Sequence, residues 1–160
     1  MTSLQSESVA RRLLIGFALT LAGACRGGTA TAPSSPVDPN LAFCVQETNR
    51  YRAMVGLPGL AESSSVEVFA AAAAQADAES GFPHGYYRSH NPGFGAENEA
   101  PNWYLPIYGT AHNLIAQAIA TFWSEGPGGG HYENIVGPYS QLGCGLFQNG
   151  SDLTVVQDFR

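Results

Sequence analysis

The sequence predicts an α+β domain in which helices pack against an antiparallel sheet. Segments with helical periodicity occupy the first part of the domain, and two β-prone runs, 143–148 and 153–159, close the chain. Asn149-Gly150 joins these runs and is a strong signal for a tight hairpin. Helices followed by a terminal hairpin favour an α+β architecture over alternating strand–helix–strand units.

Three segments show apolar residues at helical spacing, with Gly or Pro after the end of each. Their expected limits are 41–55, 64–80 and 110–125. Asn40 is the expected cap of the first helix, and Ser64 with Glu67 forms a capping-box pattern at the start of the second. A third β-prone run, 132–136, predicts another strand, whereas 81–109 predicts mostly irregular structure.

The first 25 residues have the pattern of an export signal. Arg11 and Arg12 precede an apolar run, 13–24, that has the length of a signal-peptide core and is too short to span a bilayer. The run ends in Ala22-Gly23-Ala24-Cys25, which fits leader-peptidase cleavage and also resembles a lipobox whose Cys25 is lipidated. The alternatives are a membrane-anchored lipoprotein, a free secreted protein and an uncleaved anchor. We expect a signal peptide over 1–25, a flexible linker over 26–39 and one domain over 40–160.

The charge composition of the chain indicates which partners it can bind. Seven Arg and no Lys stand against thirteen Asp and Glu, which gives a net charge of −6. A chain of this charge without a basic cluster would repel phosphate backbones, so we expect no nucleic-acid partner.

If Cys25 is lipidated or removed, Cys44 and Cys144 remain. In an oxidising compartment they either form a disulfide or stay as separately buried thiols.

The chain has four histidines, His84, His90, His112 and His131. His112 lies near the start of a predicted helix and is expected to be a surface residue. His84 and His131 lie near Glu97 and Glu125, all on predicted loops or element ends. Two imidazoles and two carboxylates could converge as a metal site or as an acid/base set. Histidines at such spacings are usually solvated or hydrogen-bonded, so the residues alone leave this open.

Five elements in order, covering about residues 40–160, resemble the CAP superfamily of cysteine-rich secretory proteins, antigen 5 and plant pathogenesis-related proteins. They are Asn49-Arg50-Tyr51-Arg52 with Gly59-Leu60, Ala96-Glu97-Asn98, Trp123-Ser124-Glu125, Gly130-His131-Tyr132 with the apolar run after it, and Gly143-Cys144-Gly145. The chain is identified as a bacterial member. The resemblance implies a three-layer α-β-α sandwich with an antiparallel sheet. We expect a Cys44–Cys144 disulfide between the first helix and the Gly-Cys-Gly strand.

In that family, two histidines and two glutamates line a central cavity. Position by position, the resemblance assigns Glu97, Glu125 and His131 to this tetrad. The first histidine falls on His84, which lies just beyond the second predicted helix, with His90 as the alternative. The resemblance implies that His84 and His131 bind Zn²⁺ or another divalent cation, with both glutamates beside them.

The resemblance does not fix an activity, because CAP domains are associated with lipid or sterol binding, metal binding, signalling and, in some members, proteolysis. No G-x-S-x-G or HExxH motif is present. We therefore expect an exported binding protein at the cell envelope, with a small apolar ligand or an envelope protein as partner and membrane contact only through an N-terminal lipid.

Two alternatives to a binding protein remain. The first is a metal-assisted hydrolase in which a divalent ion on His84 and His131 activates water and Glu97 or Glu125 acts as the base. Two histidines are fewer than the three protein ligands usual for catalytic zinc, which counts against it. The second is a purely structural envelope protein.

Overall fold

The computed structural model describes residues 38–90, 93 and 95–160. The expected export signal with Cys25, and most of the expected linker, lie outside these residues. Within the described part of the chain, no helix is both long and apolar enough to cross a membrane. The compact unit described below falls within residues 35–160.

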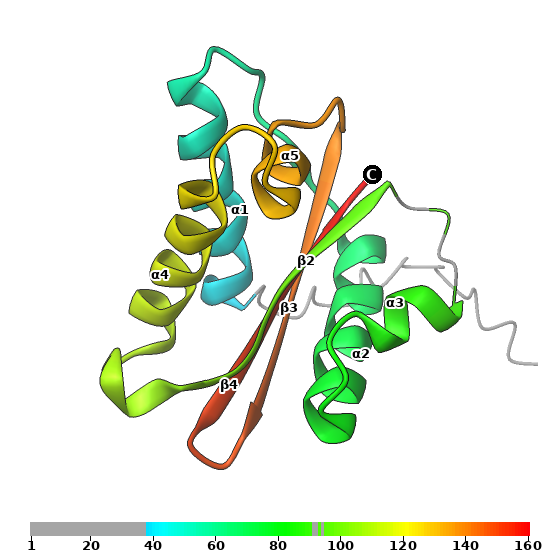
Figure 1. The fold of residues 1–160 in the computed structure, drawn as a ribbon, viewed down its shortest axis with the longest axis vertical. Helices are drawn as coiled ribbons and strands as arrows, with labels where there is room; N and C mark the ends of the chain where they lie inside the picture. The colour runs from blue at the N-terminus through cyan, green and yellow to red at the C-terminus, as the bar shows by residue number, and fades with distance from the viewer. Residues whose placement is uncertain (1–37, 91–92, 94) are drawn as a thin grey trace, which may run out of the picture. The chain divides into compact units, whose positions relative to one another are not determined.

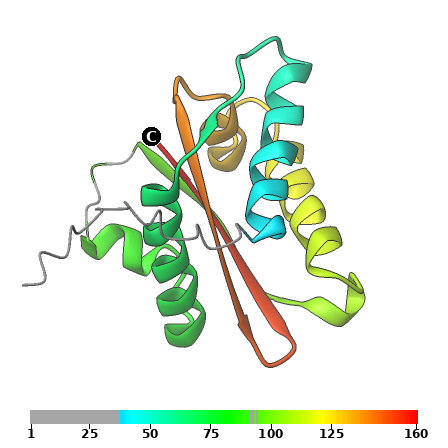
Figure 2. The same ribbon diagram turned by 180° about the vertical axis from the view of Figure 1, so that it is seen from behind.

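A four-stranded sheet lies between two layers of helices (Figure 1). The strands are β1 (Ala61–Glu62), β2 (Ala96–Tyr104), β3 (Gln141–Asn149) and β4 (Asp152–Phe159), in the order β1-β3-β4-β2. One face carries α1 (Pro39–Met54), α4 (Ala111–Ser124) and α5 (Gly130–Val136), and the other carries α2 (Ser64–Ser80) and α3 (Gly85–His90), as Figure 2 shows from behind. A short 3₁₀ helix, η1 (Leu105–Ile107), follows β2. The α+β sandwich is as expected, except that β1 pairs with β3 in parallel.

Helix α2 lies unusually close to the sheet because the strand beneath it has glycines. A Cβ atom on Gly143 would lie 2.4 Å from the backbone nitrogen of Glu67, and one on Gly145 would lie 2.1 Å from the backbone carbon of Ala70. Backbone atoms cannot move aside as a flexible side chain can. The alanine-rich face of α2 therefore contacts β3 directly.

On the opposite face, α1 is bound covalently to β3. A disulfide joins the fully buried Cys44 and Cys144, whose Cα atoms are 6.4 Å apart. This spacing is within the range that a disulfide can span. The expected Cys44–Cys144 bridge is thus confirmed.

Buried Arg52 connects α1 to the end of α5. Its guanidinium donates hydrogen bonds to the carbonyl oxygens of Ile135 at 2.6 Å and Gly137 at 2.9 Å, and its Nε donates to Pro58 O at 2.9 Å. A buried guanidinium needs such acceptors, because it cannot lose its charge in proteins. These bonds fix the C-terminal end of α5, the helix that carries His131.

The expected strand over 132–136 is wrong, because this segment is helix α5. In a helix, residues three and four apart share a face, so His131, Asn134 and Ile135 lie together. Ile135 is buried, and the Asn134 amide donates to Glu97 O at 3.2 Å. A strand would direct Asn134 and Ile135 to opposite faces. These tertiary contacts outweigh the local β propensity.

The expectation that 81–109 is mostly irregular is also wrong, since α3, β2 and η1 fall within it. Glu97 therefore lies on a strand and not in a turn. The sequence of β2 does not resemble that of a typical strand, because it has glutamates at positions 97 and 99 and a proline at position 101. Pro101 lies in a register shift between Ala100 and Trp103. Proline is tolerated here because β2 is an edge strand.

The helix caps differ from those expected. Asp38, not Asn40, caps α1, and its Oδ1 accepts a hydrogen bond from Asn40 N at 2.9 Å. Helix α2 is capped by Ser63 without a side-chain cap bond, so the capping box of Ser64 and Glu67 does not form. The helix limits themselves agree with the periodicity to within two residues.

Candidate functional site

His84 lies between the end of α2 and the start of α3, at the edge of the sheet. Gly81, in the left-handed conformation with φ of 67°, ends α2 and turns the chain. His84 itself has φ of 59°, which is uncommon for a residue with a Cβ. Its backbone N–H donates to Glu99 Oε2 at 2.6 Å, and its ring Nδ1 lies 2.8 Å from Glu97 Oε1. The two glutamates thus hold both the backbone and the ring of His84.

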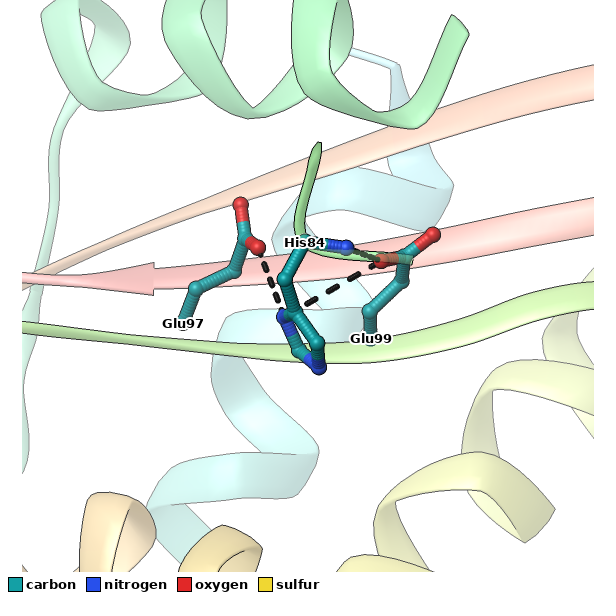
Figure 3. Close-up of side chains that lie close together, drawn as sticks. All are labelled: His84, Glu97 and Glu99. Carbon is teal, nitrogen blue, oxygen red and sulfur yellow. Dashed lines mark hydrogen bonds and ion pairs between the residues drawn. The ribbon is translucent and has the colours of Figure 1, made fainter. Parts of the chain in front are cut away.

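Strand β2 presents Glu97 and Glu99 on one face because they are two residues apart. Their side chains are 1% and 0% exposed, respectively. Burial raises the pKa of both carboxyl groups, that of Glu99 to about 7. The hydrogen bond from His84 lowers the pKa of Glu97 but does not reverse this shift, while the hydrogen bond to Glu97 raises the pKa of His84. In Figure 3, one oxygen of each glutamate points toward His84 and the other points away.

A second histidine–glutamate pair joins the end of α4 to the start of α5. Glu125 Oε1 lies 2.5 Å from His131 Nδ1, and its Oε2 accepts the His131 backbone N–H at 2.9 Å. The hydrogen bond from the His131 ring is the main reason that the pKa of Glu125 falls below its usual value. Gly129 permits this approach, since a Cβ atom there would lie 2.3 Å from the Cβ of Glu125.

The two pairs face each other across the edge of β2. The rings of His84 and His131 have their centroids 6.3 Å apart and are inclined by 30°. In each ring the Nδ1 atom lies against a carboxylate, which leaves Nε2 for a ligand. Figure 3 shows the second nitrogen of His84 pointing away from both glutamates. The structure therefore brings together the four residues His84, Glu97, Glu125 and His131.

A buried network of amides supports the His131 side of the site. The Asn98 amide donates to the His131 carbonyl at 3.2 Å and to Gln157 Oε1 at 3.1 Å, while its Oδ1 accepts from Asn134 at 2.9 Å. Gln157 in turn donates to Thr48 Oγ1 at 2.6 Å. The network connects α1, β4, β2 and α5 through the sheet, so it fixes the position of α5 relative to Glu97.

The remaining two histidines lie elsewhere. The ring of His90 stacks on Tyr86 with centroids 3.8 Å apart, on the exposed surface of α3. The ring of His112 stacks on Phe43 at 3.3 Å. His84, and not His90, is therefore the histidine placed opposite His131.

The sequence reasoning missed three acidic residues near Glu97, namely Asp77, Glu99 and Asp158. Glu99 was overlooked because 81–109 was expected to be irregular. With the strand recognised, its place two residues after Glu97 puts it on the same face. Ligand atoms of His84, Glu97 and Glu99 all lie within 4.8 Å of one another, so they could hold a cation together. An open pocket of about 250 Å³ adjoins them, lined by His84, Tyr87, Arg88 and Glu97.

Comparison with known structures bears on the fold. The crystal structure of Na-ASP-1 superposes with a TM-score of 0.56 at 17% identity, over 76% of this chain and 38% of the other. A cysteine-rich secretory protein from Staphylococcus aureus subsp. aureus Mu50 has a TM-score of 0.49 and 14% identity, over 79% of this chain and 40% of its own. An extracellular protein containing a SCP domain from Bacillus anthracis str. Ames has a TM-score of 0.49 and 18% identity, over 79% and 45%.

The chain spans less than half the length of each of these proteins, and at this identity the likeness to Na-ASP-1 concerns the fold alone. Comparison with curated protein sequences gave no match. The model of the cysteine-rich secretory protein family, CAP, matches residues 45–159. Because that match spans most of the chain, the protein belongs to the cysteine-rich secretory protein (CAP) family.

Proposed function

We propose that the protein is an exported binding protein in which His84 and His131, whose ring centroids lie 6.3 Å apart, take a divalent metal ion of the zinc class. The observation that carries this proposal is that the imidazole rings of His84 and His131 make the same kind of contact with a glutamate. Each Nδ1 lies against a carboxylate, and this leaves each Nε2 for a ligand. Carboxylate–imidazole pairs of this kind orient metal-binding histidines and raise their basicity.

The residues fit a zinc-class ion in their chemistry. Imidazole nitrogen is a preferred ligand of Zn²⁺, and nearby carboxylate oxygen is also acceptable. His84 and His131 would hold the ion, with Glu97 and Glu125 fixing the orientation of the rings. The ion would supply Lewis acidity and a site for an exchangeable ligand. A small apolar molecule or an envelope protein as the partner of the protein stays a prediction.

Export is supported by two observations of different kinds. The first 25 residues have the pattern of an export signal, and the family whose model matches residues 45–159 is described as one of cysteine-rich secretory proteins. Mass spectrometry of the N-terminus of the protein recovered from cells tests this part. A chain that retains Met1–Ala24 in the cytoplasm contradicts export, whereas a diacylated Cys25 identifies a lipoprotein.

Zinc titration calorimetry tests the metal part, with wild type compared against His131→Ala. We expect the substitution to weaken Zn²⁺ binding by more than about tenfold, since even a group that only supports a ligand contributes this much. His90→Ala is the matched control, because that histidine stacks on Tyr86 on the exposed surface of α3. Equal binding by wild type and His131→Ala overturns the proposal. Hydrolytic turnover that His131→Ala abolishes would support the metal-assisted hydrolase instead.

A further inference from the structure

The segment that joins β2 to α4 exposes apolar side chains and carries no charge. We call residues 102–110 the aromatic loop, which comprises the end of β2, η1 and the turn before α4. Tyr104 is 52% exposed and Ile107 is 76% exposed. No Asp, Glu, Lys or Arg occurs between Glu99 and Glu125. An uncharged loop that exposes two large apolar side chains close together is typical of a contact surface.

Hydrogen bonds fix the backbone of the aromatic loop. Asn102 has φ of 51°, a left-handed conformation that Asn adopts more readily than most residues. Its backbone N–H donates to Thr154 Oγ1 at 2.9 Å, and its side-chain amide donates to Ala78 O at 3.3 Å. Further along the loop, the Leu105 N–H donates to Ser151 O at 2.9 Å. The apolar side chains are therefore exposed from a backbone that is bonded to the rest of the domain.

The aromatic loop lies at the end of the molecule where the chain enters the domain. Phe43, near the start of α1, stacks on His112, near the start of α4. Tyr51 packs against Trp123 toward the other end of both helices, so α1 and α4 run parallel. The loop directly precedes α4 and thus lies at the same end as Pro39, the first residue of α1. In Figures 1 and 2, the loop and the starts of both helices lie toward the lower end.

The lipid expected on Cys25 would bring this end of the domain to a bilayer. Residues 26–38 connect Cys25 to the start of α1. Even when fully extended, a segment of this length spans at most about 45 Å. Tethering at this distance raises the local concentration of the loop at the membrane, so a contact that is weak in a free protein can form. The position and length of the tether therefore favour a lipid surface as the partner.

We propose that the aromatic loop docks onto the surface of the bilayer that holds the N-terminal lipid. The contact rests on the exported lipoprotein, but it does not depend on the metal site. Tyrosine rings such as that of Tyr104 are favoured at the membrane–water interface, and Ile107 can enter the apolar boundary below it. Because the loop has no cation, apolar burial and not attraction to anionic headgroups provides the contact. It adds a protein–lipid contact to the lipid anchor, which the sequence alone led us to expect as the only one.

The two tryptophans of the chain allow a direct test. Trp103 lies in the aromatic loop, and Trp123 lies near the other end of α4. The mature lipoprotein is recovered from cells and reconstituted in phosphatidylcholine vesicles, with or without bromine on the acyl chains, which quenches nearby tryptophan. Trp123→Phe keeps only Trp103, which should lose most of its fluorescence in brominated vesicles. Trp103→Phe keeps only Trp123, whose fluorescence should be the same in both vesicles. Added salt should leave the quenching of Trp103 unchanged.

Two matched substitutions in the Trp123→Phe background test whether the loop itself makes the contact. Ile107→Asp should abolish the quenching of Trp103, because a carboxylate opposes entry into the apolar boundary. Val68→Asp is the control, since Val68 is 73% exposed but lies on α2 in the other helix layer, and the quenching should persist. Both side chains are exposed, so both variants should keep the wild-type Tm.

The outcome is independent of metal binding. His131→Ala should leave the quenching of Trp103 unchanged, and Ile107→Asp should leave Zn²⁺ binding unchanged, so failure of the bilayer contact is distinguishable from failure of the metal site. Trp103 fluorescence that is equal in brominated and ordinary vesicles overturns the proposal, as does equal quenching in Ile107→Asp and Val68→Asp. Self-association that Ile107→Asp abolishes, without quenching, identifies a second copy as the partner and also overturns it. So does recovery of the mature chain free in the medium without a lipid on Cys25.

Discussion

The conformation of His84 is held by buried carboxylates. It has a left-handed backbone conformation, which costs about 1–2 kcal/mol for a residue with a Cβ. Glu99 accepts its N–H, Glu97 lies against its ring, and Asp77 accepts the N–H of Tyr86 two residues later. The carboxylates therefore hold the turn, and the turn in return supplies hydrogen-bond donors to buried carboxylates.

The pKa of Asp158 predicts how stability depends on pH in the metal-free protein. Burial, with a further contribution from Glu97 and Asp77, raises this pKa from 3.8 to about 8. The folded state therefore holds a proton that the unfolded state releases at a lower pH. The stabilisation is complete below about pH 4 and is lost as the pH rises toward about 8. Glu99, whose pKa is raised to about 7, changes stability in the same direction.

Thermal unfolding in the presence of a chelator checks this expectation. The Tm of wild type should fall between pH 5 and pH 8, with a loss of stability on the order of a few kcal/mol. Asp158→Asn should show a shallower fall, because it lacks the main titrating group. A wild-type Tm that rises over this range contradicts the burial of these carboxyl groups as neutral acids.

At the scale of elements, the long helices and the terminal hairpin could be predicted because their signals are local. Apolar spacing marks α1, α2 and α4, and Asn149-Gly150 marks the turn between β3 and β4. Strand β2 and helix α5 could not be predicted, because each is held by contacts between residues that are distant in sequence. The Asn134 amide binds Glu97 O, for example, 37 residues away along the chain.

The candidate site, too, could be predicted only in part. The resemblance to a known family identified His84, Glu97, Glu125 and His131, but spacing alone did not bring them together. For the buried acidic residues near Glu97 the sequence offered one signal, since Asp158 is the only charged residue in the β-prone run 153–159. Its meaning depended on knowing that β2 lies beside β4 and places Glu97 opposite it.

The contact between α2 and β3 gives a prediction at this scale. Gly145→Ala places a Cβ atom 2.1 Å from the backbone of Ala70, so helix and strand must separate. Overpacking of this kind costs about 1–3 kcal/mol. Denaturant unfolding should show this loss for Gly145→Ala and little change for Gly130→Ala, whose added Cβ meets no atom within 4 Å. Equal stability of the two variants contradicts the close contact.

In the described part of the chain, a disulfide ties one helix layer to the sheet. The Cys44–Cys144 disulfide joins residues 100 positions apart, and it links the start of the domain to the strand beside β4. Gln157 and Asn98 of the sheet add hydrogen bonds to Thr48 of α1 and to the carbonyl of His131 in α5, and Arg52 joins α1 to α5 within the helix layer. The α1 side thus combines a disulfide with buried hydrogen bonds, whereas α2 approaches β3 closely at Gly143 and Gly145.

Removing the bridge should destabilise the protein without changing its fold. For a closed loop of this length, the chain-entropy model gives about 4–5 kcal/mol, which is an upper value in practice. Denaturant unfolding of the Cys44→Ala, Cys144→Ala double variant measures the loss. Reduction of wild type with a thiol should have a similar effect, and unchanged stability in both experiments contradicts a structural role for the bridge.

Strand β2, which presents the glutamates, also forms an outer edge of the sheet, and this has a consequence for self-association. Open sheet edges invite pairing with another chain, and proteins discourage this with bulges, proline and inward-pointing charges. β2 has all three: a register shift after Ala100, Pro101 within it, and buried Glu97 and Glu99. The opposite edge, β1, has only two residues. Glu97 and Glu99, which build the candidate site, thus belong to a set of features that disfavour edge-to-edge pairing of two copies.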